Sequence, residues 1–509
     1  MSTDQTDVPA VVGDAVEQPD GGTDESSPTE QPKEGSVARS VSQAGKVEHF
    51  TIAERTARGK ATRAEVPRSV HADWEPSPHR PDPVLLLEEQ AQTRVTELVP
   101  IRYGRMLVSP FTFFRGAAYL MASDLAGGPR TGLHAQLCGD AHLSNFGMFA
   151  APDRRMVFSV NDLDETLPGP FEWDLKRLVA SFAVAGRDRG FDDAQRQAIL
   201  LSVTKAYREG IRNFATMRTL DLWYSRLDVE AAAAGLAERV SPKAVKRFER
   251  NVAKARSKDS LKAFDKLTHL VDGEPRIISE PPLIVPIEEL AAGVEHDRLV
   301  EAVRTVLRSY RRTLAGDRRR LLERFRYADA ARKVVGVGSV GTRAWIILML
   351  GHDDNDPLFL QMKEAEASVL EPFLGKSEYA NHGQRVVEGQ RLLQSASDIM
   401  LGWIRTTGID GVDRDFYVRQ LWDGKGSAQV EVMEPEGMTL YAEVCGWTLA
   451  RGHARSGDGV AIASYLGSGD VLDRALATFA ETYADQNERD YDALKAAVET
   501  GRVKAETGL

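Results

Sequence analysis

The segment Gly336-Val337-Gly338-Ser339-Val340-Gly341 constrains the fold more than any other feature of this 509-residue chain. Glycines at this spacing form a turn whose backbone can approach a phosphate closely. A dinucleotide-binding fold continues from such a turn into a helix, whereas a phosphate-covering loop continues into a second strand. The residues that follow, TRAWIILML, are rich in Trp and Ile and therefore favour a strand. A helix directly after Gly341 would instead favour a nicotinamide-dependent oxidoreductase.

The region after residue 332 is expected to contain three strands: KVVGVGSVG, TRAWIILMLG and LFLQMKEA, the last two joined by the acidic turn HDDNDP. The third strand carries Lys363, whose ammonium can reach the α- and β-phosphates of a nucleotide. A helix over 384–401 carries Glu388, which can hold that lysine by an ion pair. Three other carboxylates compete for the same pairing: Glu364, Glu366 and Glu371. A strand, FYVRQL, follows at 416–421.

A second group of polar residues lies far upstream, in Gly139-Asp140-x-His142-x-x-Asn145 and in Asn161-Asp162-Leu163-Asp164-Glu165. Phosphoryl transfer needs a carboxylate that orients or deprotonates the attacking hydroxyl, and oxygen ligands that hold Mg²⁺. Asp140 and Asn145 can supply both from one loop after a strand. Carboxylates at a strand end suit a hard cation. We expect Asp162 to be the principal ligand, Asp164 a second ligand or a surface charge, and Glu165 a rim or capping residue.

A β-hairpin between Asn145 and Asp162 would bring these two loops to one edge. Each group also has a simpler interpretation. Asp and Asn are common in turns that bind nothing, and the glycines can form a β-turn without a ligand. A metal site made of His134, Asp140 and His142 lacks further ligands at a recognisable spacing. His453, in ARGHARS, is expected to be a packed or capping residue.

The loop GDAHLSNFG resembles the catalytic loop of aminoglycoside-phosphotransferase and choline-kinase-like enzymes. NDLDE and GPFEWDL resemble their metal-binding strand end and the helix-opening aspartate that follows it. GVGSVG, the lysine of LQMK and the glutamate of VVEGQ resemble the glycine-rich loop, strand lysine and helix glutamate of the same superfamily, and FYVRQL resembles the strand that enters its hinge. From about residue 100 to its end, the chain resembles the bacterial family of unknown function DUF2252.

This resemblance implies a role for each matching position. Asp140 matches the catalytic base, with His142 beside it in the motif, and Asn145 and Asp162 match the metal ligands. Asp174 matches a structural carboxylate. Gly336, Gly338 and Gly341, with Ser339 between them, match the phosphate loop, Lys363 the phosphate-contacting lysine and Glu388 its partner. Cys138 is a departure, because the related loops usually have His there and Cys cannot organise the backbone in the same way.

The order of these segments is a second departure. The catalytic-loop elements lie at 139–165 and the nucleotide-lobe elements at 336–421, so the resemblance implies a circular permutant. We therefore expect an α+β, two-lobed protein-kinase-like fold with permuted lobe order, in which WTLARGHARS replaces the helix before the catalytic loop. Such a rearrangement is acceptable when the termini lie close together at the surface.

Composition and sequence pattern suggest five regions. Residues 1–48 form an acidic tail with few aromatic residues, expected to be disordered. An N-terminal helical extension (49–130), a mostly helical lobe with the catalytic and metal-binding loops (131–330), a small β-rich nucleotide-binding lobe (331–432) and C-terminal helices that complete the larger lobe (433–509) follow. The stretch GEPRIISEPPLIVPI is expected to interrupt the helices with turns and strands.

A net charge of -10, two cysteines, and the absence of a leader or a long apolar run favour a cytoplasmic protein that binds neither nucleic acid nor membrane. The predicted function is ATP- and Mg²⁺-dependent phosphoryl transfer to an unidentified hydroxyl-bearing small molecule or protein. Two alternatives share the fold: a catalytically inactive, pseudokinase-type regulatory module and a nucleotidyltransferase.

Overall fold

The structure is a computed structural model that describes residues 49–236 and 242–508. The chain divides into a first unit, Met1–Phe50, and a second unit, Thr51–Leu509. The tail expected to be disordered, residues 1–48, lies outside the described residues. Every helix and strand named below belongs to the second unit.

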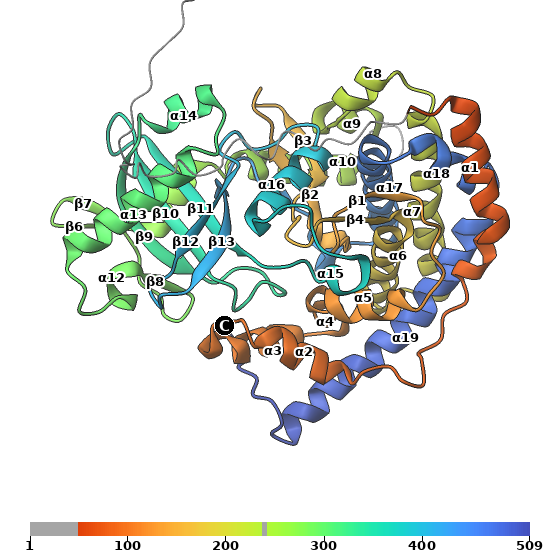
Figure 1. The fold of residues 1–509 in the computed structure, drawn as a ribbon, viewed down its shortest axis with the longest axis horizontal. Helices are drawn as coiled ribbons and strands as arrows, with labels where there is room; N and C mark the ends of the chain where they lie inside the picture. The colour runs from red at the N-terminus through yellow and green to blue at the C-terminus, as the bar shows by residue number, and fades with distance from the viewer. Residues whose placement is uncertain (1–48, 237–241, 509) are drawn as a thin grey trace, which may run out of the picture. The chain divides into compact units, whose positions relative to one another are not determined.

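A six-stranded antiparallel sheet has the order β12-β13-β11-β10-β9-β8 (Figure 1). Its strands are β8 (Ile284–Pro286), β9 (Arg326–Lys333), β10 (Ala344–Leu350), β11 (Pro357–Ala365), β12 (Gly402–Thr407) and β13 (Asp413–Gln420). β10 and β11 form the hairpin expected around the acidic turn, with Ala344 opposite Lys363. The strand expected at KVVGVGSVG is wrong in position, because β9 ends at Lys333 and the glycines lie in the following loop. β8 and most of β9 come before residue 331, so the sheet begins earlier in the chain than expected.

Both faces of this sheet are covered by helices. On one face, Ile347 and Leu360 pack in a core with residues of α13 (His296–Arg311) and α14 (Gly316–Leu322). On the other face, Ile346 and Phe359 pack with residues of α11 (Ser260–Leu267), while Ala365 packs with residues of α16 (His382–Leu393). Side chains alternate along a strand, so Lys363 shares the face of Phe359 and Ala365. We call the face covered by α11 and α16 the inner face of the sheet. Lys363 lies on it, between the part that α11 covers and the part that α16 covers.

The largest hydrophobic core lies among the helices on the other side of the unit, around α6, α7, α17 and α19 (Figure 1). The remaining helices are α1 (Ile52–Glu65), α2 (Pro83–Ala91), α3 (Val99–Met106), α4 (Pro110–Gly116), α5 (Ala118–Ala126), α6 (Phe171–Asp188), α7 (Asp193–Phe214), α8 (Thr219–Tyr224), α9 (Val229–Leu236), α10 (Pro242–Arg256), α12 (Ile287–Leu290), α15 (Glu371–Leu374), α17 (Pro435–Ser456), α18 (Gly459–Leu466) and α19 (Val471–Glu499), with 3₁₀ turns η1 (Arg68–His71), η2 (Thr96–Leu98), η3 (Leu143–Asn145) and η4 (Val430–Val432).

The sequence pattern of two of these helices agrees with what they bury. α6 follows Pro168-Gly169-Pro170, and its apolar face at three- and four-residue spacing is buried: Leu175, Leu178, Val179 and Phe182. α2 begins with Pro83 after the Asp82 cap and buries Val84, Leu86 and Leu87. ALATFAETYADQ and DYDALKAAVE form one continuous helix, α19.

In the described part of the chain, three smaller sheets accompany the six-stranded one. β2 (Phe146–Ala150) and β3 (Met156–Val160) form an antiparallel hairpin that β14 (Gly426–Ser427) and β5 (Leu227–Asp228) extend. β1 (His134–Leu137) pairs with β4 (Leu167–Pro170), and β6 (Thr268–Val271) with β7 (Glu274–Ile277). Asn145 precedes β2 and Asp162 follows β3, so the expected hairpin is confirmed and brings the two loops to one edge.

The fold is α+β, because its sheets are antiparallel and are combined with helices. Within the described ranges, no helix has the length and apolar character needed to cross a membrane.

Candidate functional site

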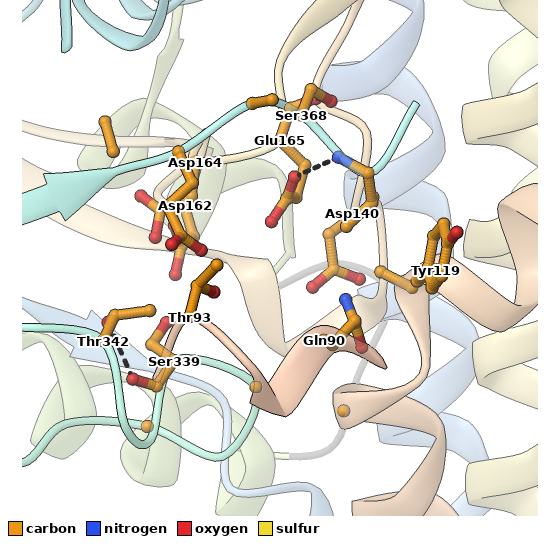
Figure 2. Close-up of a pocket in the computed structure, with 18 of the residues that line it drawn as sticks. Gln90, Thr93, Tyr119, Asp140, Asp162, Asp164, Glu165, Ser339, Thr342 and Ser368 are labelled. Atoms are coloured by element: carbon orange, nitrogen blue, oxygen red, sulfur yellow. Dashed lines mark hydrogen bonds between the residues drawn. The ribbon is translucent and has the colours of Figure 1, made fainter. Parts of the chain in front are cut away.

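A pocket of about 660 Å³ collects residues from three distant stretches of the chain. Figure 2 shows Asp140 beside Tyr119 and Gln90 on one side of it, and Asp162 and Asp164 on the other. Its lining residues fall within 89–119, 140–165 and 336–376. The N-terminal stretch supplies a wall from α2 to α5, the middle stretch the carboxylates, and the last stretch the glycine loop and the segment after β11.

Asp174 holds the backbone of the loop that carries Asp140. Its carboxylate accepts hydrogen bonds from the Cys138 amide at 2.7 Å and from the Gly139 amide at 3.0 Å. Gly139 has φ +81°, and a Cβ placed on it would lie 2.2 Å from the Glu165 carbonyl oxygen. Only glycine fits this turn, which directs Asp140 into the pocket.

Cys138 also contacts Asp174, with its thiol sulfur 3.0 Å from a carboxylate oxygen. Burial raises the pKa of this thiol well above its ordinary value, so Cys138 is a neutral buried residue. His453, from α17, lies 3.2 Å from the same carboxylate and 2.8 Å from the Tyr207 hydroxyl. An imidazole distant in sequence thus contacts the carboxylate that organises the loop, although position 138 itself is not His.

Both the side chain and the backbone of Asp140 accept hydrogen bonds. The carboxylate accepts one from Arg177 Nε at 2.6 Å, and the backbone carbonyl oxygen accepts one from the side-chain amide nitrogen Nδ2 of Asn145 at 2.8 Å. His142 Nε2 lies 3.7 Å from the Asp140 carboxylate. Burial lowers the pKa of His142 to about 4, so the imidazole is neutral near pH 7.

Lys363 lies behind the two strand-end carboxylates. Its ammonium is 3.8 Å from Asp162 and makes a close ion pair with Asp164, which also accepts a hydrogen bond from the Tyr417 hydroxyl at 2.7 Å. Burial raises the pKa of Asp162, but Lys363, Arg419 and other positive neighbours outweigh it and hold that pKa well below its usual range. Burial, together with the charge of Asp162, raises the pKa of Asp164. The surroundings therefore favour the ionised form of Asp162 more strongly than that of Asp164.

These residues fit a hard cation bound by oxygen ligands. Oδ1 of Asp162 is buried and has no hydrogen-bond partner. The side-chain amide nitrogen of Asn145 donates to the Asp140 carbonyl oxygen, so the side-chain oxygen of Asn145 remains available as a metal ligand. Among the described residues, no three His, Cys, Asp or Glu side chains converge on a point where a metal ion would sit. The available set is thus two carboxylates and an amide, which suits Mg²⁺ with remaining positions taken by water or phosphate.

The glycine loop contributes Gly336, Gly338 and Ser339 to the pocket wall, whereas Gly341 does not line it. Gly341 adopts φ +93° and turns the chain into β10. A strand therefore follows the glycines, and the strand–turn–helix arrangement that a dinucleotide-binding fold requires is not present at this place.

The N-terminal region fixes the glycine loop from outside. Arg94 donates to the Val340 carbonyl at 2.5 Å, Arg105 donates to the Gly336 carbonyl at 2.6 Å, and the Val95 amide donates to the Gly341 carbonyl at 2.8 Å. The loop is therefore bound to the same helical region that forms the opposite wall of the pocket.

The expected ion pair between Lys363 and Glu388 is not formed. Glu388 lies on α16 as predicted, but it pairs with Arg391 at 3.0 Å. The side chain of α16 that faces the site is Arg385, which donates to the carbonyls of Asp164 and Glu366, each at 2.8 Å. Helical periodicity predicted a helix here, although α16 ends at Leu393 and not at residue 401 as expected, and it did not show which of its residues face the site.

Sequence reasoning also missed two arginines. Arg177 lies one turn after Asp174 in a helix with many apolar residues, and it donates to the Phe114 carbonyl at 3.0 Å as well as to Asp140. Arg115 lines the pocket and is a lone cation in the aromatic stretch PFTFFRG. For Arg115, an isolated arginine in an aromatic stretch was the signal available; Arg177 directly follows Lys176 and carried no such signal.

A family comparison matches residues 94–497 to DUF2252, described as an uncharacterized protein conserved in bacteria. The chain belongs to the DUF2252 family. No curated protein and no solved structure matches it. The DUF2252 region contains all the candidate site residues predicted from the sequence, from Asp140 to Glu388. Glu89, Gln90 and Thr93 line the pocket but precede the matched DUF2252 region, so part of the wall lies outside it.

Proposed function

We propose that this protein is an ATP- and Mg²⁺-dependent, kinase-like phosphotransferase that acts on a hydroxyl group of a small molecule or a protein. One observation carries the proposal: the catalytic-loop segment and the glycine-loop segment, far apart in sequence, line one pocket, and Lys363 contacts Asp162 and Asp164 behind it. Each segment alone is a common local motif. Their convergence is what phosphoryl transfer requires.

The order of elements supports a permuted, two-lobed kinase-like arrangement. A glycine turn between β9 and β10, a lysine on β11, the helix α16 and the strands β12 and β13 follow one another in the six-stranded sheet. α17 then returns His453 to Asp174 beneath the catalytic loop. In the proposed permutation, α17 fills the place of the helix that comes before the catalytic loop in kinase-like enzymes, although it follows that loop in this sequence.

The residues divide the chemical tasks among them. Asp140 accepts the proton of the acceptor hydroxyl while the acceptor oxygen forms a bond to the γ-phosphorus; the bond from that phosphorus to the β,γ-bridging oxygen breaks, and ADP leaves. Asp162, Asp164 and the side-chain oxygen of Asn145 would hold Mg²⁺, which would supply charge stabilisation on the phosphate oxygens. Lys363 keeps Asp162 ionised and adds positive charge opposite the phosphates. The glycine loop covers them with backbone amides.

A second candidate is a nucleotide-binding module without turnover, of the pseudokinase type. It is favoured by the pairing of Lys363 with the carboxylates and by the pairing of Glu388 with Arg391, because active protein kinases keep the strand lysine on the helix glutamate. Nucleotidyl transfer on the same fold is a third candidate, and it differs in which phosphate bond is broken.

The test is incubation with Mg²⁺ and ATP labelled at either the α- or the γ-phosphate, together with a screen of hydroxyl acceptors. Transfer of the γ-label with release of ADP supports the proposal, transfer of the α-label supports nucleotidyl transfer, and binding without transfer supports the inactive module. Asp140→Asn and Asp162→Asn should abolish transfer. Asp153→Asn is the matched control, because Asp153 lies in the exposed turn after β2, paired with Arg226, outside the pocket.

A further inference from the structure

Arg115 lies between the two halves of the pocket. It is near the end of α4, where its carbonyl oxygen would be 3.1 Å from a Cβ placed on Gly338 of the glycine loop. Arg115 lines the same pocket as Asp140, and the charge of Asp140 acts on it. A group transferred from a nucleotide under the glycine loop to an acceptor at Asp140 would therefore move within a pocket whose wall includes Arg115.

Neighbouring residues fix this position on both sides. The Phe114 carbonyl accepts a hydrogen bond from Arg177, which also binds the Asp140 carboxylate, and the Gly116 carbonyl accepts one from Arg102 at 3.2 Å. Phe113 and Phe114 are buried, and the helix begins with a Ser109 cap. Arg177 thus fixes the position of Asp140 relative to the backbone that carries Arg115, because it donates to both Asp140 and the Phe114 carbonyl.

The other arginines at the site are already engaged. Arg94 donates to the carbonyls of Val340 and Gln90, Arg102 to the Gln90 side chain and the Gly116 carbonyl, and Arg177 to Asp140. Arg115 makes no hydrogen bond or ion pair with any residue that the structure describes, and its Nε is buried without a partner. The charges of Asp140 and Glu431 act on Arg115 without making an ion pair with it, so a bound anion would stabilise this partly buried guanidinium.

We propose that Arg115 is a catalytic residue that binds the phosphoryl group in transfer, acting as an arginine supplied from the N-terminal helices. The inference rests on the proposed phosphotransferase function. As the acceptor oxygen bonds to the γ-phosphorus and the bridging oxygen leaves with ADP, negative charge spreads over the three equatorial oxygens. The planar guanidinium can donate to two of these oxygens at once. Its attraction to the negative charge is strongest where the pocket excludes water.

The experiment compares ATP with ADP binding in the presence of Mg²⁺, by calorimetry, in the wild type, Arg115→Gln and Arg115→Lys. The proposal predicts that Arg115→Gln weakens ATP binding by about ten-fold or more, as expected for a lost charge-assisted contact, while ADP binding stays within about two-fold. Arg115→Lys should retain part of the preference for ATP and lose turnover, since ammonium cannot make the planar, two-point contact. Arg130→Gln, an exposed arginine outside the pocket, is the control.

The outcomes separate the two proposals. Equal weakening of ATP and ADP, or no change in either, overturns the role of Arg115 while leaving nucleotide binding intact. A wild-type protein that binds neither nucleotide overturns the proposed function and this inference with it. An ATP-specific loss at Arg115→Gln, with an unchanged melting temperature, supports the assignment, because a purely structural role would lower stability rather than the preference for the γ-phosphate.

Discussion

The ammonium of Lys363 lies 3.8 Å from the Asp162 carboxylate and makes a closer ion pair with Asp164, although the lysine lies on β11 of the six-stranded sheet and the two aspartates lie in the loop after β3. Lys363 is almost entirely buried, with 3% of its side chain exposed. The contact joins the hairpin β2–β3 to the inner face of the six-stranded sheet. The contact therefore stabilises the packing of these two parts and also lies at the centre of the candidate site.

Replacing Lys363 by Met should lower the free energy of unfolding by about 3 kcal/mol at pH 7, because it leaves two carboxylates without their buried counter-charge. Denaturant unfolding measures this. Asp164→Asn in the Lys363→Met background should cost less than it does alone, since the pair is already lost. Lys205→Met removes an exposed lysine that pairs with Glu209 at 4.0 Å, and should change stability by about 0.5 kcal/mol or less. Strict additivity of the Lys363 and Asp164 changes would contradict a shared ion pair.

Gly139→Ala should destabilise the protein by about 3 kcal/mol, because the new Cβ would clash with the Glu165 carbonyl 2.2 Å away. Gly132 is a matched control: it also has a positive φ, +66°, but no atom within 4 Å of the added Cβ. Gly132→Ala should cost only about 1 kcal/mol, the penalty of the backbone conformation itself. Equal losses of unfolding free energy in the two variants would show that the close approach to Glu165 is unimportant.

Acid sensitivity is expected from His71, which is fully buried with its Nε2 2.8 Å from the Tyr465 hydroxyl. Burial, together with the charge of Lys176, lowers the pKa of His71 from 6.5 to about 3. Below pH 6.5 the His71 side chain is protonated in the unfolded chain, whereas in the folded protein it stays neutral until the pH reaches about 3. Stability is therefore lost as the pH falls from 6.5, by about 1.4 kcal/mol per pH unit.

His71→Gln should remove the contribution of His71, so its unfolding free energy should fall by roughly 2 kcal/mol less than that of the wild type between pH 6.5 and 4.5. Urea unfolding at the two pH values measures the difference. His79→Gln, at an exposed position, should behave like the wild type. A wild-type slope in His71→Gln would mean that another group causes the acid sensitivity.

The sequence predicted the two halves of the site because each is a local motif whose residue types follow from its chemistry. Asn145 and Asp162 flank a hairpin, and Lys363 lies on a strand paired with the one after the glycines, so short-range patterns were enough to place them. The convergence of the two halves was implied by a family resemblance. No periodicity in the chain encodes it.

The wall formed by α2–α5 was not predicted, because it depends on contacts between segments remote in sequence. Gly104, for example, packs so tightly against Glu506 that an added Cβ would lie 1.8 Å from its carbonyl oxygen. Such packing decides that Arg94 and Arg105 reach the glycine loop and that Arg115 faces the pocket. On α16, likewise, the sequence did not show that Arg385 rather than Glu388 contacts the loop of Asp164, through the Asp164 carbonyl.

The most direct test of the central claim is calorimetric titration of ATP, with and without Mg²⁺, into the wild type, Lys363→Met and Asp162→Ala, with folding of each variant checked by circular dichroism. The account predicts micromolar, Mg²⁺-dependent binding that both substitutions weaken, because residues from both halves would then serve one nucleotide site. Absence of binding at millimolar ATP, or binding that neither substitution changes, would contradict it.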